Sequence, residues 1–223
     1  MRNEVYSMRY LLAALAVTLG SAFTLATPAH ADTAPGTAIG ADGFSVLVGA
    51  ADAPVQLEIF CEPQCPVCAH FEDASGDALS QRLAAGDLAV TYRWLTFLDG
   101  KRNNDTSARI ANTLLLAADP GTPAPSYQGF VTEMYRAQNG SADAPSATQL
   151  ATMAAHNGVS GMAIARIAID LPAADTALMN STNMTRLKQV NPDNPGTPTV
   201  YNLNTNDVID AQESGWLDSL FVS

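Results

Sequence analysis

Two cysteines three positions apart, Cys65 and Cys68, are the residues of this sequence best suited to chemistry. The apolar run Val55–Phe60 indicates a buried strand and residues 69–85 are compatible with a helix, so the pair falls between a strand and a helix. At a helix N-terminus, free N–H groups and the helix dipole favour a thiolate and lower the pKa of a thiol. Pro66 suits the first helical turn, where its missing N–H would have no partner. The spacing predicts a redox-active dithiol with Cys65 as the attacking sulfur and Cys68 as the resolving one.

A Cys-x-x-Cys pair also occurs in zinc sites and in short structural disulfides. A zinc site usually takes a second Cys or His pair at ligand spacing, and the other candidates, Cys61, His70 and His156, form no such pair. We therefore expect no metal and no cofactor. A purely structural disulfide would make the chain a binding module, with a disulfide that resists mild reductant.

The first 31 residues have the pattern of a secretory signal peptide. Arg2 and Arg9 precede an apolar run over residues 10–25, and Ala29-His30-Ala31 provides an A-x-A end, so we expect cleavage after Ala31. The alternative is an uncleaved membrane anchor. Export would place the dithiol in the periplasm, in the cell envelope or outside the cell, where disulfides persist.

The composition restricts the partners of the chain. Its 223 residues carry 22 Asp and Glu against 11 Lys and Arg, a net charge of −11. An acidic chain is a poor candidate for binding nucleic acid or anionic lipid. The length and the 47% hydrophobic content fit one globular domain, or one domain with an insertion.

The pattern of strands and helices must position the dithiol. Residues 32–43 are small and polar, with Pro and Gly, and predict a flexible lead-in. We expect strands at residues 44–49, 55–60, 88–95, 197–201 and 208–209, and a closing helix at 216–222. The helix after the cysteines would join two parallel strands in a β-α-β unit. Residues 101–190 consist of helical segments (106–118, 127–137, 147–156, 160–169 and 171–190), which predicts a helical insertion between two halves of a sheet.

Two motifs resemble those of the DsbA-like thioredoxin-fold thiol-disulfide oxidoreductases. One is residues 57–72, which contain Cys65-Pro66-Val67-Cys68, and the other is Gly196-Thr197-Pro198-Thr199-Val200. The resemblance covers residues 44–222. It implies an α/β thioredoxin-like fold, a central mixed β-sheet flanked by helices, with a helical insertion domain at about 101–190.

The resemblance also implies site residues and partners. In that family the proline of the second motif is cis and lies beside the active-site disulfide, so Pro198 would keep the approach open. The backbone of Thr197 would contact an extended substrate peptide. The expected partners are exported proteins with cysteines and a membrane redox partner that reoxidises or reduces the enzyme.

Glu58 lies on the strand that leads into the site, at a position where members of the family often carry a buried acid. There it could accept or relay the proton of Cys68 when the disulfide opens. The other interpretation is a carboxylate at a strand edge, in solvent. His70 should point away from the sulfurs as a partly exposed helix histidine.

Cys61 departs from the family pattern. The spacing Cys61-x3-Cys65-x2-Cys68 occurs in the iron–sulfur motif of radical S-adenosylmethionine enzymes, but the chain is short for their barrel. Cys61 and Cys65 also resemble the Cys-x3-Cys-Pro segment of Sco-type copper chaperones, in which two thiolates and a remote histidine bind copper; His156 is the candidate here. As an accessory thiol, Cys61 could form a mixed disulfide, dimerise the chain, compete with Cys68 for Cys65, or remain buried and inert.

We expect an exported enzyme that forms disulfides in extracytoplasmic proteins. A substrate thiolate would attack Cys65, and a second substrate thiolate would resolve the mixed disulfide. The oxidising direction rests on a stabilised Cys65 thiolate, which would favour the reduced enzyme. The alternative direction is that of a reductase or isomerase kept reduced by a membrane donor.

Overall fold

The computed structural model describes residues 35–138 and 145–221 of the chain. The predicted signal peptide, its cleavage after Ala31 and the alternative membrane anchor all concern residues outside these ranges. Among the helices in the described ranges, none is long and apolar enough to cross a membrane.

Within the described residues, six strands form one mixed sheet in the order β1-β2-β4-β3-β5-β6. The strands are β1 (Thr37–Ile39), β2 (Ser45–Gly49), β3 (Val55–Cys61), β4 (Leu88–Trp94), β5 (Thr199–Asn202) and β6 (Asp207–Ile209). The central strands β3 and β4 are parallel, as the β-α-β pattern predicts, and every other neighbouring pair is antiparallel. Central strands are covered on both faces, which explains why β3 and β4 are almost entirely buried. The predicted thioredoxin-like α/β fold is confirmed.

Strand β1 corrects one expectation. The sequence predicts a flexible lead-in over residues 32–43, but Thr37–Ile39 pair with Val46–Val48 of β2. The Thr37 hydroxyl also donates a hydrogen bond to the carbonyl oxygen of Asp119 at 2.8 Å. Tertiary pairing therefore orders three residues whose own composition carries no strand signal.

Helix α1 (Pro66–Ala85) joins β3 to β4 and carries the dithiol at its start. Cys65 is its N-cap and Pro66 occupies the first turn. The helix ends at Gly86, whose φ of 77° is left-handed and costs a glycine little. The N–H of Gly86 donates to a carbonyl of the last turn, which closes the helix before β4 begins.

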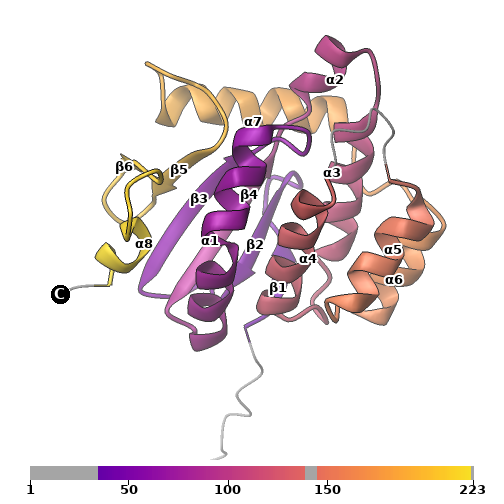
Figure 1. The fold of residues 1–223 in the computed structure, drawn as a ribbon, viewed down its shortest axis with the longest axis horizontal. Helices are drawn as coiled ribbons and strands as arrows, with labels where there is room; N and C mark the ends of the chain where they lie inside the picture. Colours follow the sequence, from indigo (N-terminus) through magenta and orange to yellow (C-terminus); the bar gives the residue numbers. More distant parts are fainter. Residues whose placement is uncertain (1–34, 139–144, 222–223) are drawn as a thin grey trace, which may run out of the picture. The chain divides into compact units, whose positions relative to one another are not determined.

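Helices occupy residues 97–190, between β4 and β5 (Figure 1). They are α2 (Phe97–Arg102), α3 (Thr106–Ala117), α4 (Ala124–Arg136), α5 (Ala147–His156), α6 (Gly161–Ala168) and α7 (Thr176–Val190), and α8 (Trp216–Ser219) follows β6. The sequence does not predict α2, whose Gly100 disfavours a helix. The Asp99 carboxylate fixes α2 by accepting hydrogen bonds from the backbone N–H groups of Ser107 and Ala108.

The sheet separates two apolar clusters. The larger one lies between the sheet and α1, α3 and α4, and contains the three cysteines. The smaller one lies on the opposite face and combines Phe60 of β3 with Leu187 of α7 and Tyr201 of β5. Figure 1 shows α1 and α4 side by side in front of the sheet and α7 behind it.

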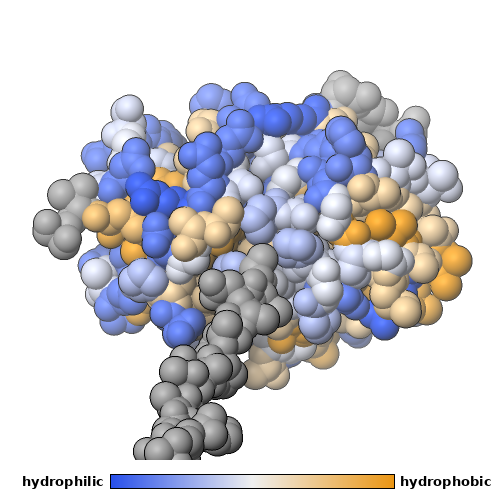
Figure 2. Space-filling model, turned by 90° about the horizontal axis from the view of Figure 1, so that it is seen from below, coloured by the Kyte–Doolittle hydropathy of each residue, from blue (hydrophilic) through white to orange (hydrophobic). Residues whose placement is uncertain are grey.

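Some apolar side chains remain at the surface. Met162 and Ile169 are 60% and 72% exposed. Figure 2 shows apolar residues gathered on the side of the molecule where α5 and α6 lie. This surface is remote from the cysteines, which belong to the core under α1.

Candidate active site

The fold brings the three cysteines together at the junction of β3 and α1. Cys61 ends β3, Cys65 caps α1 and Cys68 lies in its first turn. All three are free thiols in this structure. Cys65 is 8% exposed, whereas Cys61 and Cys68 are 0% exposed. A thiol from outside therefore reaches Cys65 first, as the sequence predicts for the attacking sulfur.

The second sequence motif lies directly against Cys65. The Cys65 thiol donates a hydrogen bond to the carbonyl oxygen of Thr197 at 3.5 Å. The Thr197–Pro198 peptide bond is cis, as the resemblance implies. Residues more than 130 positions apart thus form one site, and the backbone of Thr197 borders the sulfur.

The three cysteines belong to one buried core cluster. Burial is the main cause that raises the pKa of Cys68, and the neighbouring Cys61 thiol raises it as well. The accessory role of Cys61, as a partner in a mixed disulfide, in a dimer or in competition with Cys68 for Cys65, stays a prediction.

The predicted low pKa of Cys65 is wrong for this arrangement. The hydrogen bond with Cys68 and burial raise the pKa of Cys65 above its ordinary value, and the N–H of Cys68 offsets this only in part. Burial also raises the pKa values of Cys68 and Cys61. A neighbouring thiol and the loss of water therefore outweigh the helix N-terminus.

The predicted proton relay through Glu58 is wrong. Successive side chains of a strand point to opposite faces, so Glu58 faces α7 while Cys61 faces α1. Glu58 is 2% exposed, which also contradicts the alternative of a carboxylate in solvent. It pairs with Arg93 of β4 and with Arg186 of α7, at 2.9 Å for Arg186.

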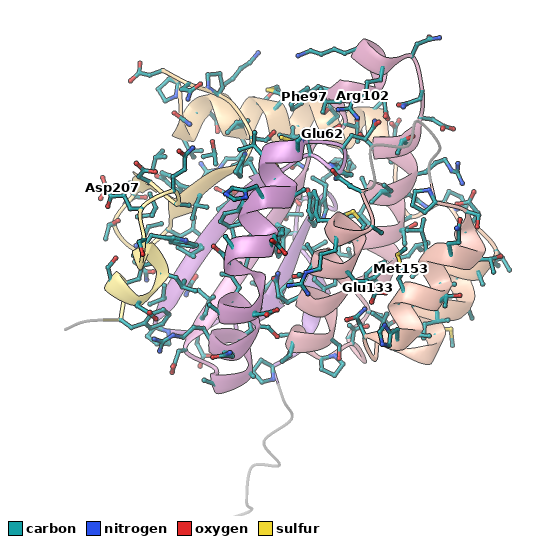
Figure 3. All side chains as sticks on the ribbon, in the orientation of Figure 1. Glu62, Phe97, Arg102, Glu133, Met153 and Asp207 are labelled. Atoms are coloured by element: carbon teal, nitrogen blue, oxygen red, sulfur yellow. The ribbon has the colours of Figure 1, made fainter. Side chains whose placement is uncertain are left out.

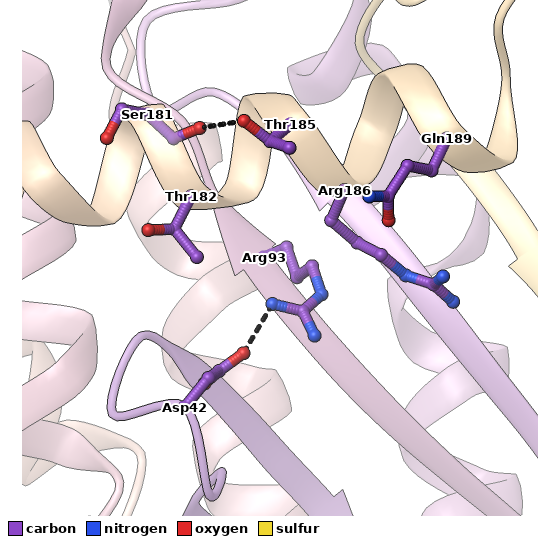
Figure 4. A pocket seen from close by; sticks show the side chains of 7 residues that line it. All are labelled: Asp42, Arg93, Ser181, Thr182, Thr185, Arg186 and Gln189. Atoms are coloured by element: carbon purple, nitrogen blue, oxygen red, sulfur yellow. Dashed lines mark hydrogen bonds and ion pairs between the residues drawn. The ribbon is translucent and has the colours of Figure 1, made fainter.

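Figure 4 shows the two arginines at a polar hollow between α7 and the sheet. Arg93 also pairs with Asp42 at 2.6 Å. Burial on its own raises the pKa of Asp42. Hydrogen bonds from the backbone of Phe44 and from the side chains of Arg93 and Ser45 outweigh burial and lower the pKa to about 2. These charges hold β4, α7 and the segment before β2 together on the face away from the thiols.

Two other buried carboxyls, Glu72 and Glu62, lie on the thiol side of the sheet, and the sequence gives no direction for the effect of either one. Glu72 accepts hydrogen bonds from Tyr92 at 3.1 Å and from Gln128 at 2.8 Å. Burial raises the pKa of Glu72 to about 7, and its charge raises the pKa of Cys61. The available signal was its position four residues after Cys68, which places both on one helix face.

Glu62 follows Cys61 and lies near Phe97 and Arg102 of α2 (Figure 3). Its carboxyl accepts hydrogen bonds from the Ser107 hydroxyl and from the backbone N–H of Gln64 at 2.7 Å. Burial raises the pKa of Glu62 to about 7. Burial thus places the pKa values of both carboxyls, Glu62 and Glu72, near neutral pH.

Gln64 connects the helical insertion to the residue before Cys65. Its side-chain amide donates to Asp99 of α2 at 2.7 Å and to Ser107 of α3 at 2.8 Å. The insertion therefore fixes the loop that carries the attacking sulfur. The sequence could place Gln64 beside Cys65, but not its partners 35 and 43 residues away.

A groove of about 520 Å³ lies between the start of α1 and the segment that carries Pro198. Val67, Phe71, Pro198 and Ile209 give it apolar walls, and His70 and Asp210 add polar groups. His70 is exposed and lines this groove, one turn from the dithiol. Pro198 lines this groove, and the residue before it, Thr197, contacts Cys65.

The copper ligand set expected from the Sco-type resemblance does not assemble. His156 is exposed on α5, and its ring nitrogen contacts Glu133 of α4 at 3.1 Å. Within residues 35–138 and 145–221, no group of three His, Cys, Asp or Glu side chains is placed to hold a metal ion.

In this structure a dithiol lies where a strand of a mixed sheet is followed by a helix, and it contacts a loop with a cis-proline. This arrangement defines the class of thioredoxin-fold proteins. The family model described as Thioredoxin (Thioredoxin_4) matches residues 42–216, and the chain belongs to this family. Among solved structures, the MdbA protein of Corynebacterium diphtheriae, a thiol-disulfide oxidoreductase, is similar at a TM-score of 0.65 and 15% identity, over 86% of this chain and 95% of that one. DsbA of Mycobacterium tuberculosis is similar at a TM-score of 0.56 and 18% identity, over 79% and 97%. These likenesses show a DsbA-like fold.

A curated relative is the serine/threonine-protein kinase PknE of Mycobacterium tuberculosis. It is 30% identical over 181 residues, which are 78% of this chain and 31% of PknE. The chain thus spans about a third of the length of the curated relatives it matches.

Proposed function

We propose that this protein is an exported thiol–disulfide oxidoreductase that forms disulfides in cysteine-containing proteins outside the cytosol. The carrying observation is the arrangement of the two thiols, with Cys65 partly accessible against Thr197 and Cys68 fully buried. The family membership supports this, as does a fold shared with proteins named thiol-disulfide oxidoreductases. The signal-peptide pattern of residues 1–31 supports the export.

The reaction uses Cys65 as the contact with substrate. A substrate thiolate attacks the Cys65 sulfur of the Cys65–Cys68 disulfide, and the electron pair of the broken bond leaves on Cys68. Burial raises the pKa of Cys68, so this sulfur takes up a proton once the disulfide opens. A second substrate thiolate then attacks the substrate sulfur of the mixed disulfide, which releases Cys65 as a thiolate and leaves the substrate oxidised by two electrons.

The reduced enzyme needs an acceptor for its two electrons. A membrane redox partner that reoxidises the dithiol fits an exported protein. The same groove beside Cys65 would serve that partner and the substrates, because both must reach the one thiol that is accessible.

A second direction is favoured by a specific observation. The pKa of Cys65 is raised, so the reduced state lacks the stabilised thiolate that makes a disulfide strongly oxidising. This favours a reductase or isomerase, kept reduced by a membrane donor. Both directions use the same two sulfurs.

The reduction potential of the Cys65/Cys68 couple distinguishes an enzyme that forms disulfides from a reductase and from a structural disulfide. The chain is equilibrated in glutathione buffers and its thiols are counted by mass, with Cys65→Ser as the control. A potential near about −120 mV identifies a donor of disulfides, near about −270 mV a reductant, and below about −300 mV a structural disulfide. The last value, together with failure to oxidise a dithiol peptide, would overturn the proposed function.

A further inference from the structure

Glu62 is a buried acid at the start of the turn that leads to Cys65, and the reaction above gives it no role. Its side chain is 0% exposed. The N–H of Cys65 donates to the Glu62 carbonyl oxygen at 2.9 Å, which closes a β-turn over residues 62–65. Pro63 occupies the second position of this turn, where its fixed φ is favoured. Glu62 and Cys65 are thus the first and last residues of one turn.

The helices of the insertion hold this turn through Glu62. One oxygen of its carboxyl bonds to the Ser107 hydroxyl of α3 and accepts from the N–H of Leu98 in α2 at 3.3 Å. The other oxygen accepts from the N–H of Gln64 at 2.7 Å, inside the turn. The hydroxyl of Tyr135 in α4 donates to the Glu62 carbonyl oxygen at 3.1 Å. Three helices therefore contact the residue that begins the turn.

No cation forms an ion pair with Glu62 within residues 35–138 and 145–221. Arg102 of α2 donates to a side-chain oxygen of the turn at 3.4 Å, and Lys101 lies over an aromatic ring. Arg109 of α3 donates to a backbone carbonyl, and Arg136 of α4 pairs with carboxylates of α1. A buried carboxylate that has only neutral donors is costly, so the neutral acid suits this site better.

A neutral carboxyl can keep the same contacts, because the Ser107 hydroxyl accepts hydrogen bonds as well as donating them. Burial raises the pKa of Glu62 to about 7, and the neighbouring Asp99 carboxylate of α2 adds to the rise. Burial also raises the pKa values of Tyr135 and Cys61, so neither group titrates between pH 5 and pH 8. Near neutral pH the charge of this cluster therefore changes at Glu62.

We propose that Glu62 is a positioning residue, which holds the attacking Cys65 in place while its carboxyl is protonated and releases the turn when it ionises. This rests on the proposed use of the Cys65–Cys68 disulfide. A carboxylate regains water only if the turn moves away from α2 and α3, so ionisation favours the open turn. In the closed turn the Cys65 sulfur lies 3.5 Å from the Thr197 carbonyl oxygen, and a fixed sulfur is attacked faster than a mobile one.

The variant Glu62→Gln tests the effect on the reaction, because its amide resembles the neutral acid and cannot ionise. The oxidised full chain is mixed with a dithiol peptide from pH 5 to pH 8.5, and the single-turnover rate constant is read by acid quench and mass. Dividing the rate constant of the variant by that of the wild type cancels the ionisation of the peptide thiols. We expect a ratio near one at pH 5 that rises above pH 7 to about threefold or more. Glu58→Gln, at a buried acid that two arginines balance, is the matched control and should give a flat ratio.

Hydrogen exchange measures the turn itself, whether or not the chain oxidises a substrate. The closed turn protects the amide of Cys65, so its exchange rate reports how often the turn opens. Ionisation of an acid with a pKa of 4.5 when exposed and about 7 when buried raises the opening constant by up to about 70-fold between pH 5 and pH 8. Protection of this amide in the wild type should fall towards that factor, relative to Glu62→Gln.

Ser107→Ala keeps the acid but removes the hydroxyl that the neutral carboxyl contacts. At pH 5 the Cys65 amide of this variant should exchange faster than that of the wild type, and its disulfide should react more slowly. Circular dichroism checks folding. If Glu62→Gln is unfolded, the exchange profile of the wild type and the behaviour of Ser107→Ala at pH 5 decide the question, and wild-type values for Ser107→Ala would contradict the proposal.

The outcomes separate this proposal from the proposed function. If the wild type oxidises the peptide but the rate ratio is flat with pH, Glu62 does not position Cys65, while the proposed function stands. If exchange depends on pH as expected but the wild type oxidises no peptide at any pH, the hold of Glu62 on the turn is supported and the proposed function fails.

Discussion

Glu72 is the residue whose environment is hardest to predict from the sequence. It lies on α1 beside charged and polar neighbours, yet it is 0% exposed and held by Tyr92, Gln128 and Thr132. Burial raises its pKa from 4.5 to about 7, because the charged form loses its water. A carboxyl of this kind is neutral for part of the physiological range and makes stability depend on pH.

Glu72→Gln should remove that dependence. The folded-state pKa is raised, so the contribution of Glu72 is fully present below about pH 4.5 and lost as pH rises through about 7. The free energy of unfolding of the variant, relative to wild type, should therefore increase by about 2–3 kcal/mol between pH 5 and pH 8. Guanidinium unfolding across that range measures it, with the exposed Asp73→Asn as control. A flat difference for Glu72→Gln would contradict the assignment.

Glu58→Gln should affect stability and leave the redox chemistry alone. The carboxylate is buried between two arginines on the face opposite the cysteines, and breaking a buried pair leaves charges without a partner. We expect a loss of about 3 kcal/mol in the free energy of unfolding. The reduction potential of Cys65/Cys68 and the alkylation rate of Cys65 should equal those of the wild type. A shifted potential would restore a link between Glu58 and the thiols.

At the scale of single residues, the sequence identifies the reactive cysteines but not the chemical environment around them. Cys65, Cys68 and the Thr197-Pro198 pair could be named because local spacing and two motifs define them. The pKa direction of Cys65 could not, because it depends on how closely Cys68 approaches and how little water remains. The role of Glu58 was predicted wrongly and that of Glu72 was not predicted, for a similar reason: the face on which a carboxylate lies depends on the register of β3 and on the packing of α1.

At the scale of helices and strands, the packing of α4 against α1 supports the helix that carries the dithiol. Gly76 of α1 faces Thr132 of α4, and a Cβ at position 76 would lie 2.4 Å from the Thr132 hydroxyl oxygen and 3.1 Å from its methyl group. Rotating Thr132 exchanges one clash for the other and breaks its hydrogen bond to the Gln128 carbonyl. The glycine therefore permits the close approach of the two helices.

Gly76→Ala should destabilise the protein by about 1–3 kcal/mol through overpacking. Gly100→Ala, in a helix where a Cβ meets nothing within 4 Å, is the matched control and should be neutral or slightly stabilising. In a Thr132→Ala background, which lacks both clashing atoms, the cost of Gly76→Ala should largely disappear. Equal costs in the two backgrounds would show that the helices are not in contact at this point.

The longer elements follow from the sequence and the short ones do not. Helix α1 and the strands β3 and β4 carry their own periodicity and stop signals. Strand β1 and helix α2 depend on partners far along the chain, β2 for the first and the N–H groups of α3 for the second. Such elements are made by tertiary contacts, so local propensity does not reveal them.

For the whole molecule, the net charge of −11 acts on every approaching thiol. The groove at Cys65 adds Asp210 near the site of attack. Attraction between opposite charges raises the rate of encounter, and salt screens it. A positively charged substrate should therefore react faster than a negatively charged one.

Matched peptides with one cysteine, flanked by lysines or by glutamates, test this. The oxidised enzyme should react with the lysine peptide roughly tenfold faster at low salt, after correction for the intrinsic reactivity of each thiol. The ratio should fall towards one in high salt and should already be smaller in Asp210→Asn. A ratio that salt leaves unchanged would show that the charge of the molecule does not steer its substrates.

The neighbourhood of Trp94 gives the protein an optical signal of its own. Trp94 lies in register with Cys61 on the adjacent strand and is stacked on Tyr92, with ring centroids 5.0 Å apart. The other tryptophan, Trp216, packs against Phe71 at 6.0 Å, one turn of α1 beyond Cys68. Both indoles therefore lie near the segment that carries the cysteines, and opening the Cys65–Cys68 disulfide should change their emission. Fluorescence would then follow the oxidation and reduction of the dithiol in real time, without any added dye.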